Sequence, residues 1–211
     1  MNSLLLVGGG GHCRSCIDVI EAEGIYEIAG IVTPFEESVE QILGYEVLGD
    51  DEDLTELIKF HPNALITVGQ ITSADLRLSL FEQLQRLGFV LPTIVSPRAY
   101  VSKNVSLGIG TIVMHDALVN TGARIGNNCI LNTKSLVEHD AIVEDHCHIS
   151  TSSVINGGTI IREKTFIGSN TITKEYITVG KTSVIGGGLR VVSDVGENTF
   201  IKNNKHIIEE K

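Results

Sequence analysis

Long hydrophobic runs are missing from this sequence of 211 residues, and no apolar stretch approaches the roughly 18 residues of a membrane-spanning helix. We therefore expect no transmembrane segment. The residues after Met1 lack the basic start of a secretory signal peptide, which favours a cytoplasmic protein. Positive charge is also scarce, with 16 Lys and Arg against 26 Asp and Glu and a net charge of −10. This balance argues against nucleic-acid binding, which needs clustered basic residues.

Cysteine is scarce as well, with four residues in the chain. Cys13 and Cys16 have the C-x-x-C spacing, which suits redox chemistry or metal binding but equally two small side chains of a helix that packs on a sheet. No second pair with this spacing completes a four-cysteine zinc site. Cys129 and Cys147 stand eighteen residues apart, and we expect both to be small apolar side chains in the interior.

The sequence is rich in a six-residue period that runs from Val95 to Val191. Sixteen of the seventeen residues at this spacing are aliphatic, and the exception is Thr173. The position four residues further on is mostly Ala, Ser, Thr or Cys. A hexapeptide repeat of this kind is typical of a parallel β-helix, because neither an α-helix nor simple alternation keeps a period of six. We therefore predict that residues 93–211 form a β-helical domain with a short C-terminal tail.

Three hexads make one triangular coil, so residues eighteen apart should stack at the strand spacing of about 4.8 Å. This places Gly157 and Gly158 on the coil that follows His139 and Asp140. An imidazole and a carboxylate would then face an open notch without side chains. A histidine beside a carboxylate suits a general base, and the Gly157 N–H could stabilise a developing oxyanion.

The residue before each interior aliphatic should point outward, because strand side chains alternate. Two of the three outer faces are then largely apolar, namely the series Ile112, Ile130, His148, Phe166, Val184 and the series Leu118, Leu136, Val154, Ile172, Arg190. Exposed apolar faces are costly in water, so we expect both to be buried against copies of the same chain. A triangular prism favours a homotrimer, with His148 in an apolar cleft between subunits.

The first 92 residues have a different pattern, in which strands alternate with helices. Aliphatic runs predict strands at residues 3–7, 26–32 and 64–68, and helical spacing predicts helices at 12–23, 54–60 and 74–87. This order indicates a small parallel sheet of Rossmann type. Pro92 and Pro97 mark the change from this domain, residues 1–92, to the repeats.

Four consecutive glycines, residues 8–11, connect the first predicted strand to the first helix. Glycines there let backbone N–H groups approach a phosphate at the helix N-terminus, although the same loop also suits a structural tight turn. A dinucleotide site would need glycine in place of Cys13 and an acidic residue where Thr33 and Pro34 stand. A mononucleotide or a sugar phosphate is therefore the better interpretation.

Histidines near the middle of the chain invite comparison with a zinc site. Trimeric β-helices such as the γ-class carbonic anhydrases hold zinc between subunits, with two histidines five residues apart and a third far upstream. Here His139, His146 and His148 have spacings of seven and two, and His115 lies twenty-four residues before His139. The arrangement does not match, so we predict no metal site. His146 is interpreted as a solvated turn residue.

A Gly-Gly-His loop on a small Rossmann-like domain, followed by hexapeptide repeats that contain Glu138-His139-Asp140, resembles the sialic acid O-acetyltransferase family. That family includes N-acetyltransferases of nucleotide-linked 4-amino sugars, such as the bacillosamine and perosamine pathway enzymes. The resemblance extends to about Val195. It implies a left-handed β-helix and acetyl-CoA as the cosubstrate.

The resemblance also assigns roles to individual positions. In the family, the histidine that matches His139 deprotonates the acceptor, and the acidic residue that matches Asp140 tunes that histidine. The position that matches Gly157 gives its backbone N–H to the thioester oxygen. Acetyl-CoA would lie between neighbouring β-helices, and the residues implied near it are His148, Ser169 and Gly187. The residues implied near the nucleotide-linked sugar are Gly10, Gly11, His12, Thr33 and Gly69.

Two positions depart from the family pattern. In the family, aspartates that contact the nucleotide are common where Thr33 and Pro34 stand, so the identity of the nucleotide base stays open. At the C-terminus, Lys202-Asn203-Asn204-Lys205 replaces the usual Gly-x-Pro-Ala-Lys ending. The leading hypothesis is an N-acetyltransferase of a nucleotide-linked sugar of the 4-amino-4,6-dideoxy type. The alternatives are O-acetylation of sialic acid or a related surface sugar, a γ-type zinc hydratase, and a binding trimer without catalysis.

Overall fold

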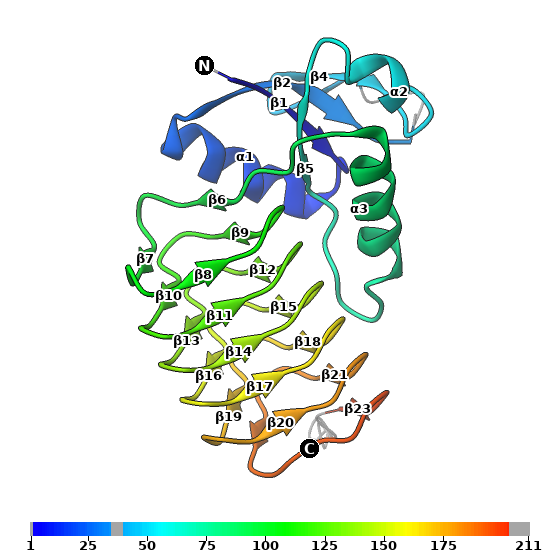
Figure 1. Ribbon diagram of the computed structural model, residues 1–211. Helices are drawn as coiled ribbons and strands as arrows, with labels where there is room; N and C mark the ends of the chain where they lie inside the picture. Colours follow the sequence, from blue (N-terminus) through cyan, green and yellow to red (C-terminus); the bar gives the residue numbers. More distant parts are fainter. Residues whose placement is uncertain (1, 35–39, 203–211) are drawn as a thin grey trace, which may run out of the picture.

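A computed structural model describes residues 2–34 and 40–202 of the chain (Figure 1). The predicted fold is confirmed, because a small Rossmann-like domain is followed by a left-handed parallel β-helix. The segment between helix α3, which ends at Leu87, and the first β-helix strand, which begins at Ile94, joins the two parts. Asn203, Asn204 and Lys205, which replace the usual C-terminal motif, lie outside the described residues.

The N-terminal sheet has the strand order β3-β4-β2-β1-β5. Its strands are β1 (Asn2–Val7), β2 (Tyr26–Val32), β3 (Gln41–Ile42), β4 (Tyr45–Gly49) and β5 (Asn63–Ile66). Four of these strands run parallel, whereas β3 pairs antiparallel with β4 and makes the sheet mixed. The sequence pattern did not predict this hairpin, because its turn residues Leu43 and Gly44 both have positive φ and leucine is unusual there.

Three helices accompany the sheet, and they are α1 (Gly11–Glu23), α2 (Leu54–Leu57) and α3 (Asp75–Leu87). The alternating side chains of β1 divide between two cores, with Leu4 packed on the α1 side and Leu5 on the α3 side. Cys13 and Cys16 of α1 are fully buried free thiols in the first of these cores. Burial raises the pKa of both thiols, so they pack as small apolar side chains.

The β-helix consists of three parallel sheets, here called the seven-strand, six-strand and five-strand faces. The seven-strand face contains β6 (Ile94–Val95), β9 (Ile112–Val113), β12 (Ile130–Leu131), β15 (His148–Ile149), β18 (Phe166–Ile167), β21 (Val184–Ile185) and β23 (Phe200–Ile201). The six-strand face contains β7 (Tyr100–Val101), β10 (Leu118–Val119), β13 (Leu136–Val137), β16 (Val154–Ile155), β19 (Ile172–Thr173) and β22 (Arg190–Val191). The five-strand face contains β8 (Ser106–Leu107), β11 (Arg124–Ile125), β14 (Ile142–Val143), β17 (Ile160–Ile161) and β20 (Thr178–Val179).

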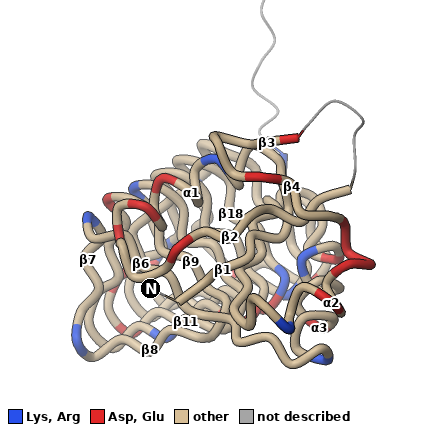
Figure 2. The backbone as a smooth tube through the Cα atoms, turned by 90° about the horizontal axis from the view of Figure 1, so that it is seen from above, with Lys and Arg blue, Asp and Glu red and all other residues tan. Residues whose placement is uncertain are grey.

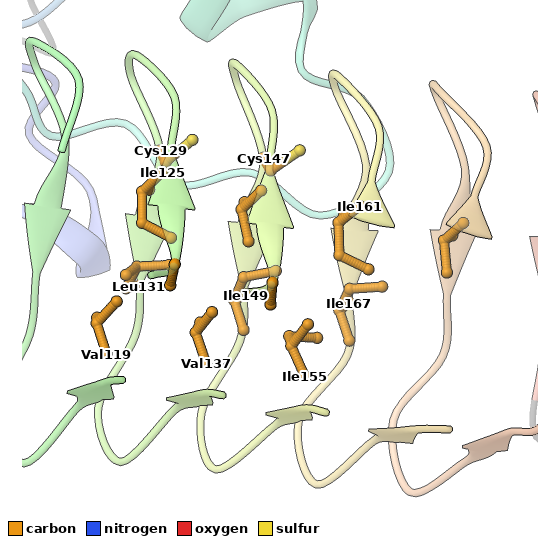
Figure 3. Packing of buried hydrophobic residues seen from close by; sticks show 14 of the residues in the cluster. Val119, Ile125, Cys129, Leu131, Val137, Cys147, Ile149, Ile155, Ile161 and Ile167 are labelled. Atoms are coloured by element: carbon orange, nitrogen blue, oxygen red, sulfur yellow. The ribbon is translucent and has the colours of Figure 1, made fainter. Parts of the chain in front are cut away.

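Residues eighteen apart are strand partners in all three faces, as the hexads predict, except at the last coil, where Val184 of β21 pairs with Phe200 of β23. The repeated aliphatic side chains point into the coil and form one continuous interior, seen for Ile149, Ile155 and Ile161 in Figure 3. Cys129 and Cys147 are fully buried beside them, and their thiols donate to the carbonyl oxygens of Glu144 and Arg162. The small side chains four residues after each interior aliphatic thus leave space for the chain to turn at each corner.

From Gly110 onward, successive corners of the coil each place one residue in the left-handed region. Positive φ recurs at each sixth residue from Gly110 to Gly188, and it includes Asp140 at 58°. Glycine, asparagine and aspartate accept this conformation best, and they hold half or more of these positions. The corner geometry therefore fixes how His139 and Asp140 leave the coil.

The expectation that two apolar faces are both covered by other copies is corrected by the structure. Ile112 and Ile130 on the seven-strand face are fully buried against α1 of the same chain, which lies across β6 and β9 (Figure 1). The N-terminal domain is thus the cover for the first coils of this face. No described segment covers the six-strand face in this way, and its Ile172 is 42% exposed. Acidic residues of the N-terminal domain lie on α1 as well as on β4 and around α2 (Figure 2), and Asp18 and Glu23 of α1 bond to His115 and to the Val95 N–H at this contact.

Candidate active site

The predicted His139–Asp140 pair stands at the corner between the six-strand and five-strand faces, after β13 and before β14. His139 Nδ1 and Asp140 Oδ2 are 2.9 Å apart, and both side chains reach solvent. This hydrogen bond, together with the charges of Asp140 and Glu138, raises the pKa of His139 above its usual range. With Nδ1 held by the carboxylate, Nε2 is the nitrogen left for a substrate.

Gly157 lies on the next coil directly against the His139 ring. A Cβ built on Gly157 would stand 2.7 Å from His139 Nε2, so only glycine allows the imidazole to occupy this position. Gly157 is buried, and no acceptor for its N–H occurs among the residues that the structure describes. The pair therefore combines a basic nitrogen with a free backbone donor one coil away, which is the arrangement that acyl transfer needs.

The notch expected beside Gly158 is not empty, and this corrects the sequence-based interpretation. The ring of Tyr176, one coil further on, lies over Gly158 and would collide with a Cβ there. Tyr176 is 75% exposed, so its ring forms an outer wall beside the Gly157–Gly158 peptide. On the other side, Asp140 rests over Gly122, whose added Cβ would stand 2.5 Å from Asp140 Oδ1. Glycines thus make room for both members of the pair.

The glycine loop opens onto a separate cavity of about 920 Å³. All five residues predicted to lie near a nucleotide-linked sugar line this cavity, and they are Gly10, Gly11, His12, Thr33 and Gly69. Gly8 and Gly9 are required by packing, because an added Cβ would meet Val68 or Ile42 closely, whereas Gly10 and Gly11 face open space. The last two glycines therefore leave room for a ligand at the N-terminus of α1, where N–H groups favour a phosphate.

His12 projects from this loop into the cavity. Burial, followed by the charges of Arg77 and His148, lowers the pKa of His12 to about 3, so the ring is neutral. Its Nε2 is buried and has no hydrogen-bond partner within residues 2–34 and 40–202. A buried ring nitrogen at a cavity is suited to hydrogen-bond a ligand atom.

His148 lies in the same cavity, on the seven-strand face, and not in an open cleft. Its Nδ1 donates to the Gln70 carbonyl oxygen at 2.6 Å, so its Nε2 accepts from the Asn132 amide at 3.1 Å. Burial lowers the pKa of His148 to about 4. Gln70 and Asn132 were not predicted as site residues, because no local pattern separates a cavity-lining amide from a solvated one.

Ser169 and Gly187 continue a column of residues that begins at the cavity. Thr133 and Thr151 line the cavity at the corner after the seven-strand face, and Ser169 and Gly187 follow on the next two coils. Backbone hydrogen bonds from Asn170 N to Thr151 O and from Gly188 N to Ser169 O join these coils. Ser169 and Gly187 are exposed, so this corner offers an extended surface that leads away from the cavity.

Chemical groups that would point to other functions are not found in the part of the chain that is described. No set of three His, Cys, Asp or Glu residues there could hold a metal ion. None of the helices there combines the length and apolar character that a bilayer crossing needs.

Comparisons with known proteins now bear on this arrangement. Residues 3–84 match the PglD N-terminal domain family. A search of curated proteins finds no match. The acetyltransferase domain of PglB from Neisseria gonorrhoeae FA1090, solved with acetyl coenzyme A, is 28% identical with a TM-score of 0.88, covering 97% of this chain and 98% of that one.

A second similar structure is perosamine N-acetyltransferase from Caulobacter crescentus, in a histidine-to-asparagine mutant solved with CoA and GDP-perosamine. It is 27% identical with a TM-score of 0.89, and the alignment covers 100% of this chain and 98% of that one. The match over residues 3–84 and these two structures support a hexapeptide-repeat sugar N-acetyltransferase. WeeI from Acinetobacter baumannii AYE shares the fold at 18% identity, a TM-score of 0.84 and coverage of 97% and 98%.

The similarity to these enzymes bears on how the two separate sites are related in space. In one chain of this N-acetyltransferase, His139 stands at one edge of the six-strand face, and the cavity opens near the other edge. Neither Gly157 nor His139 lines the cavity. The base and the ligand cavity of a single chain are therefore apart.

Proposed function

We propose that the chain transfers the acetyl group of acetyl-CoA to the amino group of a nucleotide-linked sugar of the 4-amino-4,6-dideoxy type. The observation that carries this proposal is the His139–Asp140 pair held against Gly157, together with a phosphate-type glycine loop whose last two glycines face open space. Solved relatives that hold acetyl coenzyme A, or CoA with GDP-perosamine, support the choice of substrates.

In the proposed reaction the amine nitrogen attacks the thioester carbon, and His139 Nε2 takes the proton that the amine loses. Asp140 holds Nδ1–H and stabilises the imidazolium, while the Gly157 N–H donates to the developing oxyanion. Collapse of the tetrahedral intermediate breaks the carbon–sulfur bond. The CoA thiolate then takes the proton from His139, so the base is restored without an acyl-enzyme.

The direct test is an assay of the purified chain with acetyl-CoA and each candidate acceptor. UDP- and GDP-linked 4-amino-4,6-dideoxy sugars would be compared with free sialic acid and CMP-sialic acid, with release of CoA thiol as the readout. We expect turnover with an amino sugar and formation of an amide. Preference for a sialic acid hydroxyl would replace the proposal with the O-acetyltransferase alternative.

The pH dependence of kcat/KM should report the ionisation of His139 in the His139–Asp140 pair. His139 must be neutral to accept a proton, so kcat/KM should fall below its pKa, which the Asp140 hydrogen bond raises above 6.5. Asp140→Asn removes the carboxylate that raises this pKa, and the acid limb should move to lower pH while the plateau rate falls. Profiles of kcat/KM between pH 5 and 9 would check this, and an unmoved limb would rule out His139 as the titrating base.

We further propose that the enzyme is a homotrimer in which the base of one chain serves the cavity of the next. The six-strand face supports this, because its half-buried Leu118, Leu136 and Val154 and its exposed Ile172 lack a cover within the described chain. The two edges of this face carry the two parts of the site. A head-to-tail ring would bring them together.

Complementation between two inactive variants tests this shared site. His139→Ala removes the base, and Gly11→Phe should fill the cavity, because Gly11 faces open space. Random mixing makes three quarters of the trimers mixed, each with one intact site of three, so co-expression should restore about a quarter of the parent activity. Either variant alone should be inactive. Failure of the mixture to exceed them would place the whole site within one chain.

A further inference from the structure

Arg77 of α3 is the one charged side chain among those fully buried in the described chain, and it crosses from the N-terminal domain to the β-helix. Its Nη1 donates to the carbonyl oxygens of Ile66 and Val68, at 3.1 and 2.6 Å. Its Nη2 donates to the carbonyl oxygen of Asn128 at 3.2 Å and to its side-chain oxygen at 2.5 Å. The guanidinium therefore holds the end of β5 onto the β-helix.

No carboxylate neutralises this guanidinium. None of the ion pairs within residues 2–34 and 40–202 includes Arg77, and its Nε has no partner there. Burial lowers the pKa of Arg77 only to about 10, so it stays charged at neutral pH. A buried charge without a counter-ion is costly, and it needs a reason beyond packing.

The segment that Arg77 holds is the wall of the cavity. Val68 lines the cavity, and the backbone of Gly8 packs so closely on Val68 that an added Cβ would stand 2.8 Å from Val68 N. Gln70, two residues further on, is tied to the β-helix through bonds to His146 and His148. The guanidinium thus lies one peptide behind the surface on which the glycine loop rests.

His146 completes this contact and corrects the expectation of a solvated turn residue. Its side chain is buried, packs edge-on against Phe81 of α3, and lies 3.0 Å from the Asn128 amide nitrogen. Burial lowers the pKa of His146, so it adds no second positive charge beside Arg77.

Among the described residues, none that lines the cavity carries a charged side chain. Its lining has no Lys, Arg, Asp or Glu, and the two histidines in it are neutral. Within residues 2–34 and 40–202, the positive potential that a nucleotide diphosphate in this cavity would meet comes from the N-terminus of α1 and from the guanidinium behind the wall. The Coulomb effect of Arg77 on His12, and on His148, indicates that this field reaches the cavity.

We propose that Arg77 is a positioning residue for the diphosphate of the acceptor, fixing the cavity wall and supplying its positive charge from behind. This inference rests on the proposed function, because it assumes that the cavity takes a nucleoside diphosphate group. It explains why a net acidic chain leaves this guanidinium without an acidic partner. A role limited to joining the domains would be served as well by a neutral or paired side chain.

Asn128→Asp tests the charge with a side chain of nearly the same size, and it also removes the amide N–H groups that face the Arg77 carbonyl oxygen and His146 Nδ1. The new carboxylate would accept the same hydrogen bond from Arg77 Nη2 and neutralise the guanidinium, and Asp tolerates the positive φ of 51° at this position. We expect Kd for UDP and GDP, measured by calorimetry, to rise on the order of tenfold. Kd for uridine and guanosine, and KM for acetyl-CoA, should change less than about twofold.

Two further variants separate the charge from the contact. Arg77→Lys keeps the charge but loses most of the hydrogen bonds, so the melting temperature should fall while preference for the diphosphate over the nucleoside persists. Arg77→Met removes both the charge and the hydrogen bonds, so the melting temperature should fall and the preference for the diphosphate over the nucleoside should be lost. Equal nucleotide affinity in the parent and in Asn128→Asp would overturn the inference about Arg77 and leave the proposed function unaffected. A parent that binds neither UDP nor GDP would also overturn the cavity assignment under the proposed function.

Discussion

Replacing His139 by alanine is expected to lower kcat for acetyl transfer by about 10²–10⁴-fold, the usual cost of losing a general base. KM for acetyl-CoA and for the acceptor should change little, because the side chain lies outside the cavity and 48% of it is exposed. The physical reason is that no other described side chain offers a basic nitrogen beside the free Gly157 N–H. Steady-state kinetics with both substrates varied would measure this.

The chain supplies a matched control for this experiment. His115-Asp116-Ala117 repeats His139-Asp140-Ala141 at the same position of the hexad, twenty-four residues earlier. The His115 ring, however, is bound to Ser96 at 2.6 Å and to Asp18 of α1 at 2.8 Å. His115→Ala should therefore affect stability more than kcat. Near-normal turnover in His139→Ala, or an equal loss in both variants, would contradict the assignment of the base.

Gly157→Ala should produce a second large loss, on the order of 10²-fold in kcat. The new Cβ would stand 2.7 Å from Nε2 and 2.8 Å from Cε1 of His139, so the ring must move, and small displacements of a catalytic group are costly. Alanine keeps the backbone N–H, so the loss would reflect the position of the base and not the oxyanion donor. Kinetics at a pH well above the acid limb would measure it.

Two controls make this prediction specific. Gly196→Ala adds the same methyl group where the nearest atom is 3.7 Å away, and it should leave kcat unchanged. The double variant Gly157→Ala/His139→Ala should be no slower than His139→Ala alone, because both changes act through one ring. Additive losses would show that Gly157 contributes independently of the histidine.

Much of the fold could be predicted because the interior of the β-helix imposes its period on the sequence. A slip of one residue would turn the side chain of Val143 or Ile149 outward, so the hexads alone specify which residues stack. The same stacking placed Gly157 against His139 before any coordinates were known. Local patterns also located β1, β2, α1 and α3 within a few residues.

Other parts of the site could not be predicted, because they depend on contacts between segments far apart in the chain. Tyr176 covers Gly158 only through the direction in which its ring leaves the corner. Arg77 looks like any arginine of an amphipathic helix until α3 is docked on the β-helix. Thr33 marked a departure from the family, yet it still lines the cavity.

The sequence by itself therefore determined the coil, its register and the neighbours of each corner residue, because these follow from a repeat of fixed length. The tertiary structure adds the reason why the identical His-Asp-Ala motif at His115 is not a second free base. Docking of α1 on the first coils engages His115 with Asp18 and Ser96, and it leaves His139 free beside Gly157. The same docking covers Ile112 and Ile130 of an apolar face that was expected to bind another subunit, since buried apolar area is gained wherever the chain can supply it.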